Sequence, residues 1–236
     1  MILKLEADMA LTAEEREAVL QLPHRRVRLD ADTDIVREGD RPSRSCVLLS
    51  GFACSYKATG DSKRQTLAFH IPGELPDLQS LHLKTMDNSL ATLTACEVAL
   101  IEHVHLRALC HRNPRVADAL WRETLIAASI FREWVLNIAR REGAARVAHL
   151  LCEWYVRLRA VRLVDGFSCD LPLTQIELAD ASGFSTVHVN RVLQELRARR
   201  LIVLEGGRLT ILDWPALVEL GDFDDAYLHL NPAQSP

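Results

Sequence analysis

A short segment, residues 186–191, brings together side chains with several kinds of hydrogen-bonding group in the sequence TVHVNR. Arg191 carries a planar guanidinium that can donate two parallel hydrogen bonds, for example to O6 and N7 of guanine. The Asn190 amide can pair with N6 and N7 of adenine. Val187 offers only an apolar contact, such as one with a thymine methyl group. The candidates for base contacts are therefore Thr186, Val187, His188, Asn190 and Arg191.

Hydroxyl and amide side chains near this segment suit phosphate oxygens, which position a protein on DNA without specifying sequence. These candidates are Thr174, Gln175, Ser185 and Gln194. The formal net charge of the chain is −4, but residues 185–208 hold five arginines against two glutamates, a local excess of three positive charges. The basic residues therefore lie where a contact with DNA would need them.

Two short helices joined by a tight turn would hold these side chains in place. Thr174, with Glu177 three residues later, forms a capping-box pattern at the first helix, predicted over residues 173–181. Gly183 can supply the left-handed turn, and Ser185 can cap the second helix, predicted over residues 185–200. The side chains expected to face inward are Ile176, Leu178, Ala179, Val189, Val192, Leu193 and Leu196.

A hairpin signal at Gly206 and Gly207 follows the second helix, between two β-rich stretches. Together with the two helices it favours a winged helix-turn-helix, in which the N-terminal part of the second helix enters the major groove of DNA. The alternative is a helical subdomain with a solvated basic face. After the hairpin, Asp213 can cap a last helix through Leu220, and the residues beyond Asp222 are expected to form a loosely held acidic tail.

A long helix is predicted from Pro114 to Arg140, where the chain contains no further proline and no glycine. About 26 residues at about 1.5 Å each give a helix about 40 Å long, which is long for a small domain. We expect its apolar stripe to pair with a second copy of the chain; the alternative is an ordinary core helix. The stripe consists of Val116, Leu120, Thr124, Ala127, Phe131, Trp134 and Ile138.

The region before this helix has a β-rich character, with glycines separating short apolar runs. Residues 46–52, 66–71 and 93–101 are predicted strands, and such regular short strands with glycine turns indicate a sandwich or barrel. The region after the long helix begins with a predicted amphipathic helix at residues 144–160.

The composition is that of a globular protein with a substantial core. Of 236 residues, 48% are hydrophobic and 25% are charged. No apolar run reaches the roughly 18 residues of a membrane span, and the first residues lack a signal-peptide pattern. We expect a cytoplasmic protein with no membrane partner.

Cysteine and histidine spacing provides no metal or catalytic motif. The six cysteines are scattered without a C-x-x-C pair, so we expect small buried apolar residues rather than ligands of a metal or iron–sulfur cluster. His103 and His105 are the one tempting pair, but a third ligand at sensible spacing is missing. No catalytic residue and no metal ligand is therefore assigned. A metal-dependent β-barrel enzyme is the alternative.

Several spaced motifs, in order, resemble the Crp/Fnr family of bacterial regulators over nearly the whole chain. They lie at residues 38–40, 47–52, 63–65, 69–74, 94–99 and 173–196. The resemblance implies an α+β fold, with an eight-stranded antiparallel, jelly-roll-like β-roll of the cyclic-nucleotide-binding type at residues 1–112. It further implies a dimerisation helix at 113–142 and a winged helix-turn-helix at 143–236. A homodimer on pseudo-palindromic promoter DNA, with RNA polymerase as a partner, is also expected.

The chain departs from the cyclic-AMP-binding members of that family at the effector site. Gly73 and Glu74 match, and the glutamate of such members binds the ribose. The adjacent Arg-Ser that holds the cyclic phosphate in those members is replaced here by Met86 and Asp87. With no arginine present, the Asp87 carboxylate would repel a buried phosphate. We expect no control by cyclic AMP and no cofactor. The alternative is a signalling protein whose roll senses another effector or haem, with His70, His82, His103, His105 and His111 available as ligands.

The second helix departs from the family pattern as well. Members that recognise a TTGAT-like half-site carry E-x-x-S-R, where this chain has Val187, Asn190 and Arg191. Arg191 should keep its guanine contact. Val187 cannot accept a hydrogen bond from cytosine N4, so the half-site is expected to differ at that base pair.

Overall fold

The computed structural model describes residues 1–6, 10–60 and 63–230. The chain divides into two compact units, Met1–Ala128 and Ser129–Pro236, and each is described by itself. Within the described residues, no helix combines the length and the apolar character that crossing a membrane requires.

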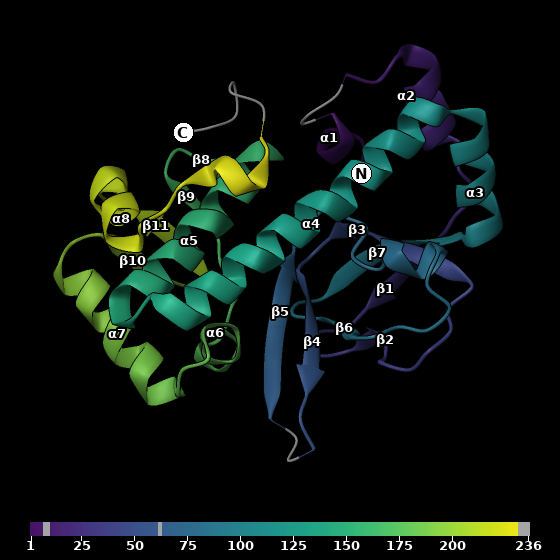
Figure 1. The fold of residues 1–236 in the computed structure, drawn as a ribbon. Helices are drawn as coiled ribbons and strands as arrows, with labels where there is room; N and C mark the ends of the chain where they lie inside the picture. Colours follow the sequence, from purple (N-terminus) through teal and green to yellow (C-terminus); the bar gives the residue numbers. More distant parts are fainter. Residues whose placement is uncertain (7–9, 61–62, 231–236) are drawn as a thin grey trace. The chain divides into compact units, whose positions relative to one another are not determined.

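Two antiparallel sheets form the first unit (Figure 1). One has the order β1-β7-β3, with bounds Arg25–Leu29, Cys96–Glu102 and Arg44–Ser50. The other has the order β2-β6-β4-β5, with bounds Asp34–Val36, Ser89–Thr92, Ala53–Ala58 and Arg64–His70. This confirms the antiparallel roll. The described part of the unit holds seven strands, where the resemblance implied eight.

The predicted strand over residues 93–101 is in fact a turn followed by a strand. β6 ends at Thr92 and β7 begins at Cys96, because the backbone N–H groups of Leu93 and Thr94 donate to the Phe52 carbonyl instead of to a strand. The same turn explains Gly51, whose φ is 82°. A Cβ there would lie within 2.4 Å of the Ala95 carbonyl oxygen, so only glycine fits.

Each face of the β1-β7-β3 sheet covers a different core. The interior of the roll is an apolar cluster that includes Val36, Leu48, Met86 and Val98. On the other face, Val47, Ala99 and Ile101 belong to a cluster shared with helical residues. The helical elements of this unit are α1 (Ile2–Leu5), α2 (Ala13–Leu20), η1 (Leu78–Leu81), α3 (His103–Arg112) and the first half of α4 (Pro114–Arg140).

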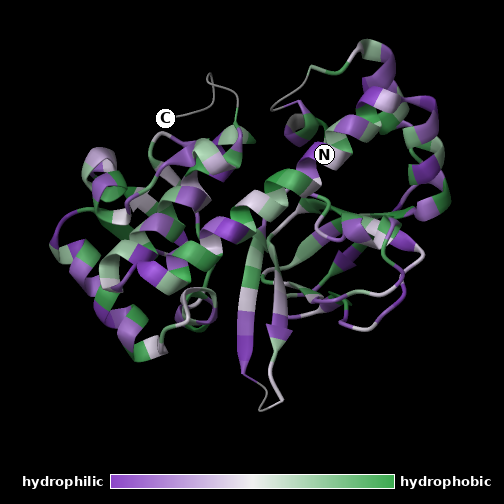
Figure 2. Cartoon of the chain, in the orientation of Figure 1, coloured by the Kyte–Doolittle hydropathy of each residue, from purple (hydrophilic) through white to green (hydrophobic). Residues whose placement is uncertain are grey.

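The apolar residues of α4 recur along its whole length (Figure 2), but most of the predicted stripe does not form a free surface. Val116 and Leu120 lie in the core of the first unit. Trp134 is buried in the second, where its indole N–H donates to Glu153 at 3.0 Å. The prediction that these three residues form a seam between copies is therefore wrong. Of the other four, Ala127 and Phe131 are exposed and Thr124 and Ile138 are half-buried.

The face of α4 that stays exposed is a different one. Its large apolar side chains are Trp121, Leu125, Phe131, Val135 and Leu136, each 46–65% exposed. The sequence pattern did not separate these two sets because α4 carries apolar residues on more than one face. The face that carries Val116, Leu120 and Trp134 is covered by the cores of the two units.

Helix α5 (Gly143–Ala160) is the centre of the second unit, since nearly all of its side chains are buried. It contacts α7 and α8, whose bounds are Thr186–Ala198 and Trp214–Gly221. Gly221 allows the close crossing of α8 over α5, because a Cβ at that position would lie 2.8 Å from the backbone nitrogen of His149. A four-stranded antiparallel sheet completes the unit in the order β10-β11-β9-β8, with bounds Ile202–Glu205, Arg208–Ile211, Ser168–Asp170 and Val164–Asp165.

The segment after α8 is packed against the second unit, so the prediction of a loosely held tail beyond Asp222 is wrong for its described part. Phe223 and Leu228 are buried, and η2 (Asp225–Leu228) carries Tyr227. The Tyr227 hydroxyl donates to Glu153 at 2.8 Å and lies 3.2 Å from His149 Nε2. Burial raises the pKa of Tyr227 and lowers that of His149, so both stay uncharged in this network.

Candidate nucleic-acid interface

Two short helices, α6 (Gln175–Ser182) and α7, meet at a left-handed turn. The Thr174 hydroxyl accepts from the Glu177 backbone N–H at 3.2 Å, and the Glu177 carboxylate accepts from the Thr174 N–H at 2.5 Å. Gly183 has φ 67°, the conformation that glycine adopts without strain. Ser185 caps α7 by accepting from the His188 N–H at 3.2 Å. The capping box, the turn and the second cap lie where the sequence predicted them.

The buried side of this pair differs from the prediction at one residue. Val189, Val192, Leu193 and Leu196 of α7 are at most 3% exposed, and Leu178 and Ala179 of α6 are 2% and 4% exposed, as predicted. Ile176, predicted to face inward, is 62% exposed. At about 100° per residue it lies on the side of α6 opposite to the buried residues.

The polar side chains of α7 do not all stand equally free. Val187 is 79% exposed, and Thr186, Arg191 and Gln194 are also exposed. Asn190 and His188 are half-buried. The Asn190 amide donates to the Gln175 side-chain oxygen at 3.1 Å, which joins α7 to the start of α6.

His188 supports Arg191 rather than presenting a free edge. Arg191 lies with one guanidinium nitrogen 2.9 Å from His188 Nδ1. The His188 ring packs on Phe184 with a centroid distance of 4.3 Å. Among the predicted base contacts, Thr186, Val187 and Arg191 are therefore the exposed ones, whereas His188 positions Arg191.

The helix-turn-helix is tied to the end of α4 through Arg146 of α5. Its side chain donates to the Ser182 carbonyl at 2.7 Å and to the Arg141 carbonyl at 2.8 Å. The guanidinium also lies 4.2 Å from the centre of the Phe184 ring. The turn between α6 and α7 is thus held by charge-assisted hydrogen bonds and a cation–π contact. The sequence pattern did not predict this anchor, since Arg146 and Phe184 are 38 positions apart.

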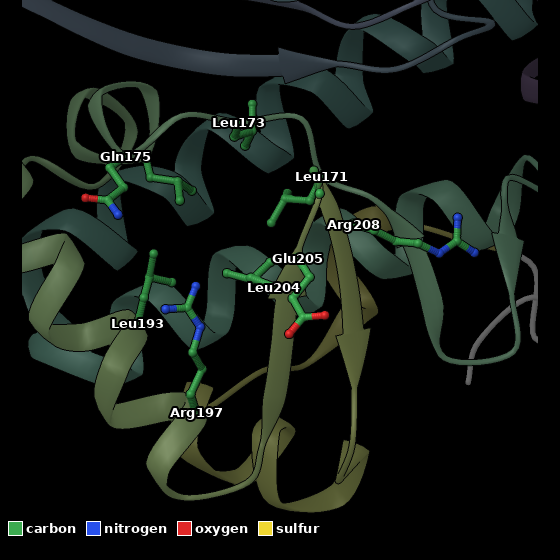
Figure 3. A pocket seen from close by; sticks show the side chains of 11 residues that line it. Leu171, Leu173, Gln175, Leu193, Arg197, Leu204, Glu205 and Arg208 are labelled. Atoms are coloured by element: carbon green, nitrogen blue, oxygen red, sulfur yellow. The ribbon is translucent and has the colours of Figure 1, made fainter.

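The hairpin of β10 and β11 stands beside α7 and borders a groove of about 160 Å³ (Figure 3). Arg197 from α7 and Glu205 from β10 line it, whereas Arg208 points away from Arg197 and pairs with Asp170 at 3.3 Å. Arg197 was not among the predicted phosphate contacts. It could have been found, because Asn190, Gln194 and Arg197 follow the four-and-three spacing of one helix face.

Comparison with known proteins agrees with this arrangement of a β-roll, a long helix and a winged helix-turn-helix. Residues 26–113 match the cyclic nucleotide-binding domain and residues 145–220 match the Crp-like helix-turn-helix domain. The transcriptional activator FnrL of Cereibacter sphaeroides is 26% identical over 203 residues, which cover 84% of this chain and 81% of FnrL. The chain belongs to the Crp/Fnr family of transcription regulators.

Two further comparisons extend the match. The nitrogen fixation regulation protein FixK of Bradyrhizobium diazoefficiens is 25% identical over 197 residues, 83% of this chain and 81% of FixK. The structure of FixK2 from Bradyrhizobium japonicum superposes with a TM-score of 0.77 at 23% identity, covering 84% of this chain and 98% of FixK2. This Crp/Fnr chain therefore has the fold of a family regulator with a DNA-binding domain at its C-terminal end.

The four residues predicted as an effector pocket in this Crp/Fnr chain do not share one environment. Gly73 has φ 101°, and a Glu74 oxygen lies 3.3 Å from His70 Nδ1. Met86 is 2% exposed and belongs to the apolar core of the roll, whereas Asp87 is exposed. The Met86 side chain is therefore part of the core packing and is not available as a ligand contact.

Most thiol groups of this Crp/Fnr chain are buried, whereas most of its histidines are exposed or half-buried. All six cysteines are free thiols; five are buried and Cys110 is half-buried, as predicted. Burial raises the pKa of Cys169 to about 12. His103 lies within hydrogen-bonding distance of the Ser45 and Ser80 hydroxyls, at 3.2 and 3.1 Å. Among the described residues, no three histidine, cysteine or acidic side chains gather as metal ligands.

Proposed function

We propose that this regulator acts as a homodimer on a pseudo-palindromic promoter site, with α7 of each copy in the major groove. The observation that carries the proposal is the exposed N-terminal part of α7, where Arg191 and Val187 face solvent on a capped and anchored helix. Two such helices related by a two-fold axis contact half-sites about 10 bp apart, centre to centre. RNA polymerase is the proposed partner on the promoter, and the bacterial cytoplasm is the proposed location.

The proposed contacts fall into two classes. Arg191 binds guanine O6 and N7, while Val187 makes an apolar contact that a glutamate-bearing relative could not make. Thr174, Gln175, Ser185 and Gln194 contact phosphates, and Arg197 at the groove beside the hairpin joins them. Base and phosphate contacts predict different mutational effects, which allows the assignment to be tested.

The test of the α7 assignment is DNA binding by the full chain to a site selected from random sequence. Arg191→Ala should weaken binding by about 1–3 kcal/mol and relax specificity at one base pair of each half-site. Arg197→Ala should weaken binding about equally for all sequences and lower the salt dependence by about one phosphate contact. Unchanged affinity and unchanged specificity of Arg191→Ala would refute the assignment.

We propose α4 as the dimer seam, through its exposed face rather than through the buried stripe. Trp121, Leu125, Ala128, Arg132, Val135 and Ala139 are exposed and follow successive spacings of four and three residues, the pattern of a coiled-coil seam. Burying the large apolar members of this set against a second copy would remove them from water, which favours association.

The oligomeric state tests the seam. Leu125→Glu should convert the dimer to a monomer in analytical ultracentrifugation at micromolar concentration, because two charges would face each other in an apolar contact. Val104→Glu is the matched control, since Val104 on α3 is 66% exposed and lies outside the seam. A dimer that survives Leu125→Glu, or is lost equally in the control, would exclude this seam.

We also propose that cyclic AMP does not control this protein. Glu74, which would bind the ribose, is paired with His70. Positions 86 and 87 hold Met86 and Asp87, so no arginine is present there to balance the negative charge of the cyclic phosphate. Calorimetric titration of the full chain with cyclic AMP should give no binding heat at millimolar nucleotide, and saturable binding would contradict the proposal.

A further inference from the structure

The interior of the β-roll opens to solvent at a cavity that none of Gly73, Glu74, Met86 and Asp87 lines. The cavity has a volume of about 550 Å³, within the range of about 300–1,000 Å³ typical of small-molecule sites. Strands β1, β2 and β7 and the loop between β2 and β3 form its walls. It lies entirely within the first unit.

The inner wall of this cavity is apolar. Strand β1 contributes alternate residues, because successive side chains of a strand point to opposite faces. The apolar lining consists of Val27, Leu29, Ile35, Val36, Val98 and Leu100. Val98 and Val36 are buried members of the roll's core, and the other four are half-buried against it. The core of the roll thus ends at an accessible apolar surface rather than at a closed layer of side chains.

Three arginines border the same cavity: Arg25, Arg41 and Arg44. They are exposed, and their side chains form no hydrogen bond or ion pair with another described residue. The nearby acids are already engaged. Asp34 accepts from Arg37 Nε at 2.9 Å and from the Tyr56 hydroxyl at 2.8 Å. Asp40 accepts from the Arg37 backbone N–H at 2.8 Å. Around the cavity, the three guanidinium groups therefore outnumber the carboxylates of Asp34 and Asp40.

A buried carboxyl completes the lining. Asp77 is 3% exposed, and its carboxylate accepts from the Cys46 backbone N–H at 2.8 Å, with its own backbone N–H and the Cys46 thiol as further donors. Burial raises its pKa to about 7. Below that pH the group is neutral, so it adds no negative charge against a bound anion and supplies an O–H donor.

We propose that this cavity binds an amphipathic organic acid, with the apolar body against the half-buried Leu29 and Leu100 and the carboxylate held by the arginines at the rim. A guanidinium matches a carboxylate with two parallel hydrogen bonds, which fixes the orientation of the acid. The apolar wall selects for a hydrophobic body, since burying that body removes it from water. Small hydrophilic anions have no apolar body to bury, and neutral apolar molecules have no carboxylate for the arginines to bind.

Three probes of one series test the proposal on the full chain by isothermal titration calorimetry. 4-Phenylbutyrate carries both features, 4-phenylbutan-1-ol lacks the charge, and acetate lacks the apolar body. Phenylbutyrate should bind with saturation and at least about tenfold more tightly than either of the other two. Equal binding of the alcohol would reduce the site to a non-specific apolar crevice and overturn the assignment, as would the absence of phenylbutyrate binding.

Adjacent residues of β1 provide a matched pair of variants. Arg25 lines the cavity, whereas Arg26 points to the other face of the sheet and lies 3.7 Å from Glu97. Arg25→Gln combined with Arg44→Gln should weaken phenylbutyrate binding at least about tenfold, and Arg26→Gln should leave it unchanged. Equal loss in Arg26→Gln would indicate a diffuse charge effect and contradict the proposed site.

Filling the cavity gives an independent test. Leu100→Trp should abolish phenylbutyrate binding by occupying the apolar space. Near-ultraviolet circular dichroism and an unchanged unfolding midpoint establish that this variant is folded. If it misfolds, the arginine variants alone decide the proposal, because their side chains are exposed. Binding that persists in a folded Leu100→Trp chain would place the ligand elsewhere.

Discussion

Two carboxylic acids, Asp77 in the first unit and Glu153 in the second, are buried to a similar degree, at 3% and 1% exposure, but their surroundings differ. Glu153 is surrounded by donors: the indole N–H of Trp134, the guanidinium of Arg157 and the hydroxyl of Tyr227 all reach it within 3.1 Å. The donors to Asp77 are only its own backbone N–H and the backbone N–H and thiol of Cys46, and Asp77 borders a cavity.

Glu153 therefore has a structural role, whereas Asp77 lies where a ligand in the cavity could contact it. The donors to Glu153 come from α4, α5 and η2, so a single carboxylate ties three elements of the second unit together. Asp77 ties only its own loop to β3, through Cys46, and it lines the cavity. Equal burial therefore does not indicate an equal role; the number and origin of the donors decide it.

The largest expected effect is that of Glu153→Gln. The change removes the charge that balances buried Arg157, and breaking such a pair costs about 3–5 kcal/mol. The free energy of unfolding of the second unit, measured with urea by circular dichroism, should fall by that amount. Glu219→Gln, at an exposed position of α8, is the control and should change this free energy by less than about 0.5 kcal/mol. A loss below about 1 kcal/mol would mean that Glu153 does not hold these three elements together.

The opposite sign is expected for Asp77→Asn. The folded pKa of about 7 exceeds the unfolded value of roughly 3.9. The stability associated with the proton is thus complete below about pH 4 and is lost as the pH rises to about 7. Asparagine keeps an acceptor for Cys46 and never ionises.

The Asp77→Asn chain should therefore be more stable than the parent by about 1–3 kcal/mol at pH 8, and the gain should shrink towards pH 4. Urea unfolding of both chains at pH 4.5, 6 and 8 measures it. A gain that does not depend on pH would show that Asp77 does not titrate near 7 and would remove the contrast with Glu153.

The smallest effect is expected for Tyr227→Phe, which removes one donor to Glu153 and leaves two in place. Its hydroxyl contributes about 1.5 kcal/mol, the lower end of the range for a hydrogen bond to a charged group, because the other two donors still satisfy the Glu153 carboxylate. A matched comparison is Tyr56→Phe, whose hydroxyl donates to Asp34 at 2.8 Å in the first unit. Both tyrosines are half-buried, but the Asp34 side chain is 25% exposed and that of Glu153 only 2%. A larger loss of stability for Tyr56→Phe than for Tyr227→Phe would show that burial of the accepting carboxylate does not strengthen these hydrogen bonds.

The parts of the molecule that the sequence predicted well are those determined by neighbouring residues. The capping box at Thr174, the turn at Gly183 and the cap at Ser185 involve partners three or four positions apart, so a short stretch of sequence contains each pattern in full. The glycine turns between short strands predicted a sandwich or barrel, and the family resemblance implied the antiparallel roll.

The failures share a dependence on distant partners. The C-terminal segment is ordered by Glu153, 74 positions before Tyr227. Val116 and Trp134 were placed on a seam because helical spacing identifies an apolar face but not the element that covers it. The cavity beside Asp77 depends on strands that are neighbours only after folding, so no local pattern of the sequence could indicate it.

The anchor at Arg146 gives the length of α4 a meaning beyond packing. Contacts run from the Arg141 carbonyl through Arg146, Phe184 and His188 to the guanidinium of Arg191. Each residue added to an α-helix rotates the next segment of the chain by about 100° and advances it by about 1.5 Å. In the proposed homodimer, one residue inserted in α4 would therefore alter the phase at which the two copies meet the turns of the double helix, without changing any of the proposed DNA contacts.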